Sequence, residues 1–167
     1  MELSGLHVSP NPPEGGDIIN DCILIDNAMN PVQFVIPKPD ETTVEKWIEL
    51  ALNIIIPRGI TNIHDAWQDP VTVKVLQKIA EKGELPIRIY GMLSSSYTKF
   101  LKQFLNQGHF RSEFYTIRAV KAFIDGALGS RGAALLEPYC DDTNNCGLIL
   151  ISIKEFKKLA QRCRDTG

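Results

Sequence analysis

The sequence predicts an α/β fold built on a parallel sheet. Three short apolar runs, at residues 60–64, 87–93 and 116–124, alternate with stretches whose apolar residues recur at helical spacing. The runs are nearly continuous, which is typical of strands that are covered on both faces. This alternation indicates parallel strands joined by right-handed crossovers. A closed eight-stranded barrel takes roughly 250 residues, so the 167 residues of this chain predict a part of a TIM-type (β/α) barrel.

The first part of the chain is expected to differ from the rest. Residues 1–41 are rich in Pro, Gly, Asn and Asp, and they predict an irregular segment with one or two short strands at the apolar runs 22–25 and 33–36. Residues 42–167 are expected to hold the alternating α/β units. The length suits one ordinary core, so we expect residues 1–167 to form a single domain.

The first predicted helix begins at Thr42. Thr42 and Glu45 have the spacing of a capping box, in which each side chain satisfies a free amide at the helix start. Pro57 and Gly59 end the helix before the first strand. The residues that share one helical face are Val44, Trp47, Ile48, Ala51, Leu52 and Ile55.

Three further helices follow by the same criteria. Asp69 is a good N-cap for a helix that ends near Gly83, and residues 97–105 carry an apolar stripe. Ser152 and Glu155 form a second capping box, and the helix behind it is expected to turn Phe156, Leu159 and Cys163 inward. The pattern stops at Gly167 on a helix end, as if it were cut before a next strand.

Composition excludes several classes of protein. The net charge is −2 and the basic residues are scattered, which disfavours nucleic-acid binding. No apolar run approaches the roughly 20 residues that cross a bilayer, and the first residues show neither the basic region nor the apolar region expected of a signal peptide. The cysteines form no CxxC pair, so reduced thiols and a cytoplasmic setting are favoured over disulfides. They are Cys22, Cys140, Cys146 and Cys163.

Reactive groups of parallel α/β folds gather at the C-terminal ends of the strands. His64 and Asp65 end the first predicted strand, so both are candidates to lie near a substrate. The alternative for His64 is a structural, hydrogen-bonded histidine. Residues 92–96 and 121–131 follow the next two strands.

Lys121 lies inside the third apolar strand. Period-two alternation puts residues 121, 123 and 125 on one face, so Lys121 and Asp125 are expected to point the same way. A lysine in a barrel interior is costly unless it is neutralised, paired or modified. Carboxylation by carbon dioxide would turn its amine into a carbamate that bridges two divalent metals. The alternatives are an ion pair with Asp125 or the opposite strand face.

A glycine-rich run covers residues 126–132. It lacks the Lys-Ser/Thr of a P-loop and the GxGxxG order of a dinucleotide-binding site. The simpler interpretation is that its small residues let the loop lie close to a ligand or to neighbouring backbone. Arg131 in this run would anchor a substrate carboxylate or pair with Asp125. The sequence does not rank these two roles.

These motifs resemble the YtcJ-like amidohydrolases, whose relatives include N-substituted formamide deformylases. The resemblance rests on VKAFIDGALGSRGAALLEPY at 120–139, ILIDNAM at 23–29, GITNIHDA at 59–66 and LPIRIY at 85–90. It implies a TIM barrel with one or two divalent metals, usually zinc, that activate water for attack on a C–N bond of a small amide-like substrate. Lys121 then matches the family's candidate carboxylated metal ligand. Asp125, Arg131 and His64 match positions near the mouth of the site.

The departures from the family are equally informative. The family uses a His-x-His pair and further histidines and an aspartate from later strands, and this sequence contains no His-x-His. One ligand does not hold zinc tightly, so we expect the chain to bind no metal tightly and to be an inactive fragment of a hydrolase. The competing hypotheses are a non-catalytic binding or regulatory module, and an unrelated small α/β enzyme that uses Lys121 as a Schiff-base or general-base group. A partial barrel is also expected to self-associate through exposed sheet edges.

Overall fold

The computed structural model describes residues 2–3, 6–7, 11–13, 15–20 and 22–166. The chain divides into two compact units. The sheet unit consists of Pro39–Ala122 and Lys157–Gly167, and the second unit of Met1–Lys38 and Phe123–Phe156. Each unit is described by itself.

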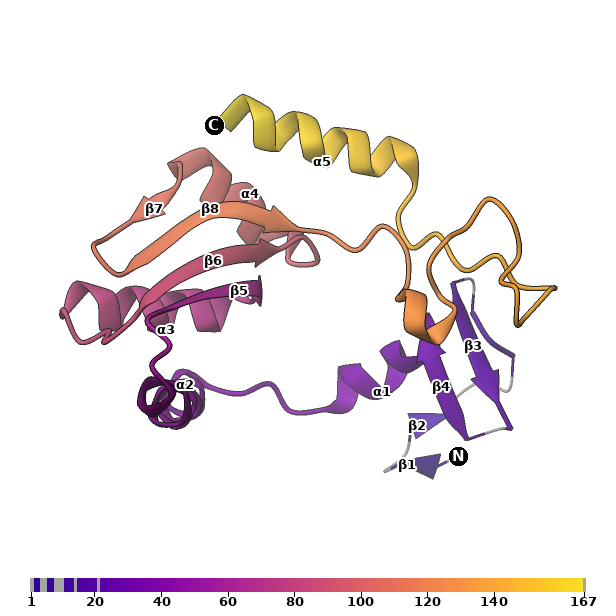
Figure 1. The fold of residues 1–167 in the computed structure, drawn as a ribbon, viewed down its shortest axis with the longest axis horizontal. Helices are drawn as coiled ribbons and strands as arrows, with labels where there is room; N and C mark the ends of the chain where they lie inside the picture. Colours follow the sequence, from indigo (N-terminus) through magenta and orange to yellow (C-terminus); the bar gives the residue numbers. More distant parts are fainter. Residues whose placement is uncertain (1, 4–5, 8–10, 14, 21, 167) are drawn as a thin grey trace. The chain divides into compact units, whose positions relative to one another are not determined.

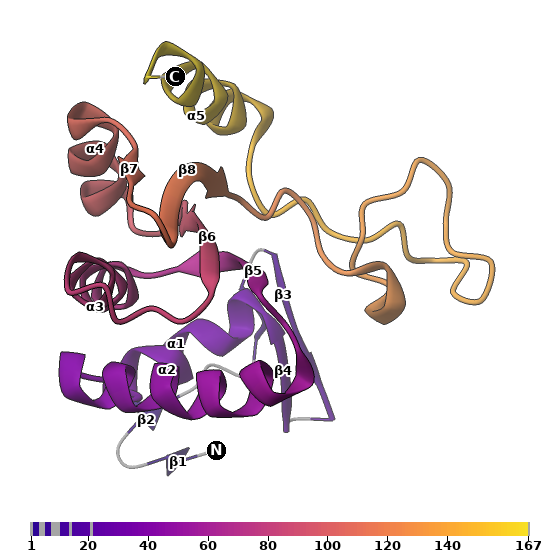
Figure 2. The same cartoon turned by 60° about the vertical axis from the view of Figure 1, so that its left-hand side comes forward.

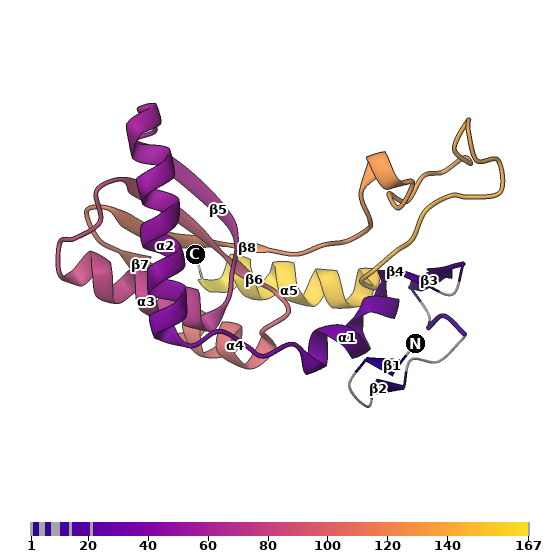
Figure 3. The same cartoon turned by 90° about the horizontal axis from the view of Figure 1, so that it is seen from below.

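The sheet unit is built on four strands in the order β5-β6-β8-β7. Strands β5 (Asn62–Gln68), β6 (Arg88–Ser94) and β8 (Tyr115–Lys121) are parallel, and they lie side by side in Figures 1 and 3. Strand β7 (Phe110–Arg111) pairs with the start of β8 in the antiparallel direction. The predicted α/β fold with a parallel sheet is confirmed.

Helices connect the parallel strands. Helix α3 (Pro70–Glu81) joins β5 to β6, and α4 (Thr98–Gln107) leads from β6 towards β8. Figure 2 shows α3 and α4 on the same side of the sheet. Helix α2 (Glu41–Ile55) packs against α3, and α5 (Ile153–Thr166) is the last helix in the element order.

The helix starts confirm two of the predicted caps and correct one. The Asp69 carboxylate accepts a hydrogen bond from the Thr72 amide at 2.8 Å, and Ser152 and Glu155 make the reciprocal bonds of a capping box. Helix α2 does not begin at a Thr42 cap. Its N-cap is Asp40, whose extended backbone brings the carboxylate to the Thr43 amide. The predicted capping box at Thr42 is therefore wrong by two residues.

The core lies between the sheet and its helices. Leu93, Leu101 and Ile117 are almost completely buried there, and Leu159 of α5 packs against the same cluster. The stripe of α2 is only partly buried, since Trp47 is 56% exposed. The buried members of the cluster are Val73, Leu76, Leu85, Ile87, Ile89, Leu93, Leu101, Phe104, Tyr115 and Ile117.

Two strands differ in extent from their predictions. The first runs over Asn62–Gln68 and not 60–64, and the third ends at Lys121 and not at residue 124. The apolar residues 122–124 continue past the observed end of the third strand, so composition alone misplaced that end. Strand β7 was not predicted, because two residues that pair back onto a neighbour carry no periodic signal.

The second unit contains short elements. Strands β1 (Glu2–Leu3) and β2 (Leu6–His7) form one antiparallel pair, and β3 (Gly16–Ile19) and β4 (Ile23–Asp26) form another. The predicted strand at 22–25 is therefore confirmed. The run at 33–36 lies mostly in helix α1 (Asn30–Val35), after the 3-10 turn η1 (Asn27–Met29), so that strand prediction is wrong. A proline at the start of α1 favours the helix.

Residues 123–152 form a long loop segment of the second unit. Asp125 forms an isolated bridge with Ile149, and the Leu135 amide donates to the Cys146 carbonyl at 2.8 Å. Two more 3-10 turns occur within the described residues. One is η2 (Ile56–Arg58) in the sheet unit, and the other is η3 (Leu128–Ser130) in this segment. None of the described helices has the length and apolar character that a membrane span requires.

Candidate site at the C-terminal ends of the parallel strands

A bulge interrupts strand β5 near its C-terminal end. Asp65 pairs with Gly91 and Gln68 with Leu93, so β5 advances three residues while β6 advances two. One extra residue reverses the alternation of faces beyond it. Gln68 consequently returns to the core, where it is 1% exposed, whereas Trp67 is 40% exposed.

The buried Gln68 amide is satisfied at both ends. Its Nε2 donates to Asp65 Oδ2 at 3.0 Å, and its Oε1 accepts from the Tyr115 hydroxyl at 2.6 Å. Burial and the nearby Asp65 charge raise the pKa of Tyr115 above its usual range, so the phenol remains a proton donor. The structure thus places Asp65 on the core side of β5, in contact with Gln68.

His64 lies on the other face of β5. Its neighbour Asp65 belongs to the core side, and successive side chains of a strand alternate. His64 is exposed, and its ring lies 5.2 Å from the ring of Tyr90, its partner in β6. The adjacent candidates His64 and Asp65 are therefore separated by the sheet, and only His64 is on the face away from the core.

A second bulge lies in strand β8 and determines the position of Lys121. Gly91 pairs with Ile117 but Met92 with Ala119, so β8 has one extra residue there. Past the bulge Val120 packs against the core cluster, and Lys121, which pairs with Ser94, takes the opposite face. Without the extra residue, Lys121 would share the core face of Ile117.

Lys121 is the last residue of β8 and half-buried. It thus lies at the C-terminal end of a parallel strand, on the same face of the sheet as His64. Its carbonyl accepts a hydrogen bond from the Ser95 amide at 2.9 Å. This end of the sheet is the candidate site.

The predicted alternation from Lys121 to Asp125 is wrong, because the strand ends at Lys121. Asp125 belongs to the second unit. Its carboxylate accepts a hydrogen bond from the Ala134 amide at 3.1 Å, which ties the start of the 123–152 segment to its middle.

Arg131 also lies in the second unit and forms a bidentate pair with Asp141, not with Asp125. Its Nε and Nη2 donate to the two carboxylate oxygens at 3.1 and 2.8 Å. These hydrogen bonds lower the pKa of Asp141 and raise that of Arg131. Both side chains are exposed, so the pair contributes little to the free energy of unfolding.

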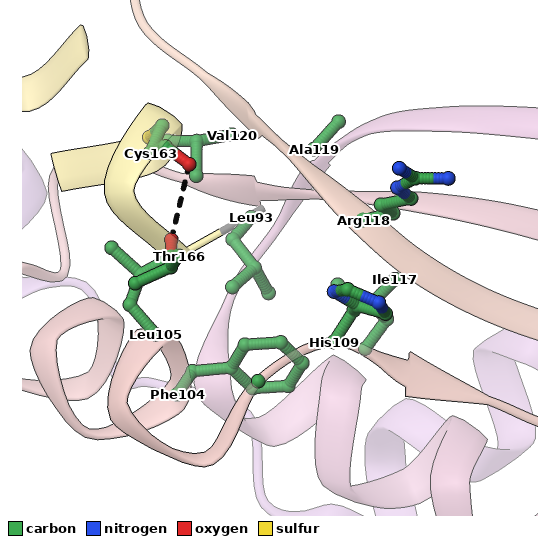
Figure 4. A pocket seen from close by; sticks show the side chains of 11 residues that line it. Leu93, Phe104, Leu105, His109, Ile117, Arg118, Ala119, Val120, Cys163 and Thr166 are labelled. Atoms are coloured by element: carbon green, nitrogen blue, oxygen red, sulfur yellow. Dashed lines mark hydrogen bonds between the residues drawn. The ribbon is translucent and has the colours of Figure 1, made fainter. Parts of the chain in front are cut away.

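A separate pocket lies on the core side of the sheet, between β8, α4 and α5 (Figure 4). Its empty volume is about 410 Å³, part of which is open to solvent. Burial raises the pKa of the Cys163 thiol at its edge. The apolar side chains that line it include Leu93, Phe104, Leu105, Ile117, Ala119 and Val120. Because Val120 and Lys121 take opposite faces, this pocket is not part of the candidate site.

The described residues do not form a complete metal site. They contain no group of three or more His, Cys, Asp and Glu side chains placed to hold a metal ion. Catalytic zinc sites use about three protein ligands and a water. Lys121 would supply at most one of them, after carboxylation.

Three residues beside the bulge in β5 were not singled out in the sequence. Gln68 and Tyr115 are buried polar groups in apolar surroundings, and Gly91 lies between them in β6. The only local signal was a glycine within a predicted strand, which often marks close approach of another group.

Comparison with known proteins gives the family. The amidohydrolase family model matches residues 8–167, which is nearly the whole chain. The chain belongs to the amidohydrolase family. Within this family it is 26% identical to the "Putative amidohydrolase YtcJ" of Bacillus subtilis (strain 168) over 178 residues. It is also 26% identical to "Protein LONG AFTER FAR-RED 3" of Arabidopsis thaliana over 188 residues.

The amidohydrolase chain spans about a third of the length of these curated relatives. The alignments cover 100% of this chain but 33% and 32% of the two relatives. A solved structure, "an uncharacterized metal-dependent hydrolase" from Pyrococcus horikoshii OT3, matches with a TM-score of 0.73 at 22% identity. That match covers 94% of this chain and 32% of the other. The sheet unit is accordingly one part of a TIM-barrel fold.

Proposed function

We propose that this chain forms part of the barrel of a metal-dependent hydrolase that acts on carbon–nitrogen bonds other than peptide bonds, such as those of small amides. Membership of the amidohydrolase family supports the reaction class. The observation that carries the proposal within the structure is the position of Lys121. It ends a parallel strand on the face away from the core, where active sites of barrels lie.

Lys121 is the proposed metal residue. In the complete protein a carboxylated Lys121 would bridge divalent metals, for which zinc is the proposed identity, and a bound metal would supply hydroxide at neutral pH by lowering the pKa of water to about 7. His64, on the same face, is proposed to lie near the substrate. Asp125 and Arg131 are proposed to lie near the mouth of the site.

The chain by itself is proposed to be inactive, because its described residues do not complete a metal site. We expect the purified chain with added zinc to show no turnover of a panel of N-substituted amides. We also expect no tight zinc binding in equilibrium dialysis. Zinc-dependent turnover that is lost in Lys121→Ala but kept in Lys102→Ala, an exposed helix lysine, would overturn the proposed inactivity.

The parent function is tested by sequencing the gene beyond both ends of this chain. A His-x-His strand upstream, with strand-ending histidines and an aspartate downstream, would support the hydrolase. Absence of these ligands from the complete reading frame would overturn it in favour of a non-catalytic binding or regulatory module.

Two further properties are proposed from the structure of the sheet unit and the cysteines. Strand β5 is at an edge of its sheet, which supports self-association through edge pairing. A clean monomer in light scattering at high concentration would contradict it. All four cysteines are free thiols, which supports a cytoplasmic setting. Localisation of the tagged protein by microscopy or cell fractionation tests that setting.

A further inference from the structure

Both bulges of the sheet begin at the same place. Gly91 of the middle strand pairs with Asp65 on one side and with Ile117 on the other. The extra residue follows directly after each of these two partners. A shared origin indicates that one feature near Gly91 holds both irregularities.

That feature is the amide group of Gln68. A Cβ atom at Gly91 would lie only 2.1 Å from Gln68 Oε1 and 2.7 Å from its Cδ, so the amide lies directly over the glycine. The same Oε1 accepts the hydrogen bond of Tyr115. A side chain of β5 thus reaches β8 across the middle strand, through space that only a glycine leaves open. We call these hydrogen bonds of Gln68 to Asp65 and Tyr115 the Gln68 bridge.

We propose that Gln68 and Tyr115 are positioning residues of the candidate site, whose hydrogen bond over Gly91 holds the two bulges that turn Trp67 and Lys121 away from the core. The importance of this site rests on the proposed function. The Gln68 bridge itself rests only on the geometry of the sheet.

Physical chemistry explains why such a bridge is needed. A regular β5 would put Trp67 in the core and Gln68 on the other face, and burying a large aromatic side chain is favourable by itself. The bulged register buries a polar amide instead, which is tolerated only when the amide is hydrogen-bonded. The Gln68 bridge therefore selects the register that exposes Trp67.

The test uses Trp67 as a reporter. Trp47→Phe is the background, because Trp47 and Trp67 are the two tryptophans of the chain. In this background Tyr115→Phe removes one hydroxyl and leaves Gln68 Oε1 buried without its donor. We expect roughly tenfold faster amide hydrogen exchange in both 65–68 and 117–121, and a measurable shift in the acrylamide quenching of Trp67.

Gly91→Ala should disrupt the same bridge by steric collision, since its methyl group would overlap the Gln68 amide. We expect the same two segments to respond. Two matched controls leave the bridge intact. Tyr139→Phe removes the hydroxyl of another buried tyrosine, which donates to the Ala133 carbonyl, and Gly129→Ala adds a methyl group where no atom lies within 4 Å.

The proposal is overturned if Tyr115→Phe and Gly91→Ala leave Trp67 quenching unchanged, or if faster exchange stays within β8 for the first and within β6 for the second. Should Gly91→Ala not fold, Tyr115→Phe alone decides between these results. Because the readouts follow structure and not hydrolysis, a failed bridge would leave the proposed function standing. Loss of the proposed function would likewise leave the bridge standing.

Discussion

The sheet unit and the 123–152 segment of the second unit are ordered by different means. In the sheet unit, Leu93 and Ile117 are at most 1% exposed within a continuous apolar cluster. In the 123–152 segment, Leu136 is 104% exposed and Ile149 61%. That segment is held by hydrogen bonds and by close contacts of glycine with backbone. Hydrophobic patterning could therefore predict the first region but not the second.

The largest expected effect comes from replacing a buried leucine of the sheet unit, compared with an exposed leucine of the 123–152 segment. Leu93→Ala should destabilise the sheet unit by about 2–5 kcal/mol, because it leaves a cavity in a closely packed cluster. Leu136→Ala, at the fully exposed leucine, should change stability by no more than about 0.5 kcal/mol. Urea denaturation followed by circular dichroism measures both. Equal costs would show that the 123–152 segment also depends on apolar burial.

A smaller effect is expected from a glycine of the 123–152 segment. Gly147 has a φ of +78°, and a Cβ there would lie only 1.9 Å from the Ala133 carbonyl oxygen. Gly147→Ala should cost about 1–3 kcal/mol through strain and collision. Hydrogen exchange should become faster in residues 133–147 and stay unchanged in β6.

The control for this substitution is Gly83→Ala. Gly83 also has a positive φ, +71°, but nothing lies within 4 Å of its added Cβ. Gly83→Ala should lower the free energy of unfolding by about 1 kcal/mol, because only backbone strain is added. If both substitutions lower the free energy of unfolding equally, the close approach of Gly147 to Ala133 does not stabilise the segment.

The smallest expected effect concerns pH. Hydrogen bonds from Arg131 hold the pKa of Asp141 below its usual 3.8. A carboxyl group whose pKa is lower in the folded state stabilises the fold above its unfolded pKa and loses that contribution as the pH falls through the folded pKa. Carbon-13 NMR titration should show the Asp141 pKa rising towards 3.8 in Arg131→Gln.

Arg118→Gln is the matched control, because Arg118 is an exposed arginine of the sheet unit and is not a partner of Asp141. It should leave the titration of Asp141 unchanged. A similar rise in both variants would assign the low pKa to the overall charge of the chain and not to the bidentate pair.

Much of the sheet unit could be predicted because its signals are local. The cap at Asp69 and the capping box at Ser152 each depend on residues three positions apart, and both are confirmed. The cap of α2 was misplaced because Asp40, Thr42 and Thr43 all suit that role, and backbone conformation decides among them. The extent of the domain stays a prediction.

Of the candidate site residues, His64 and Lys121 lie on one face of the sheet, and Asp65 lies on the other. Asp125 and Arg131 have partners within the second unit, Ala134 and Asp141. Sequence pattern could not identify these partners, because each contact joins residues nine or ten positions apart in an irregular loop.

The sequence by itself determined the class of fold, the alternation of the three parallel strands with helices, and the family, since these follow from periodicity and contiguous motifs. Only the tertiary structure decided which face Trp67 and Lys121 occupy. Period-two alternation counts from the start of a strand, and a single extra residue inverts everything after it. Where that residue falls depends on contacts of β5 and β8 with Gly91 of the neighbouring strand, which no local pattern records.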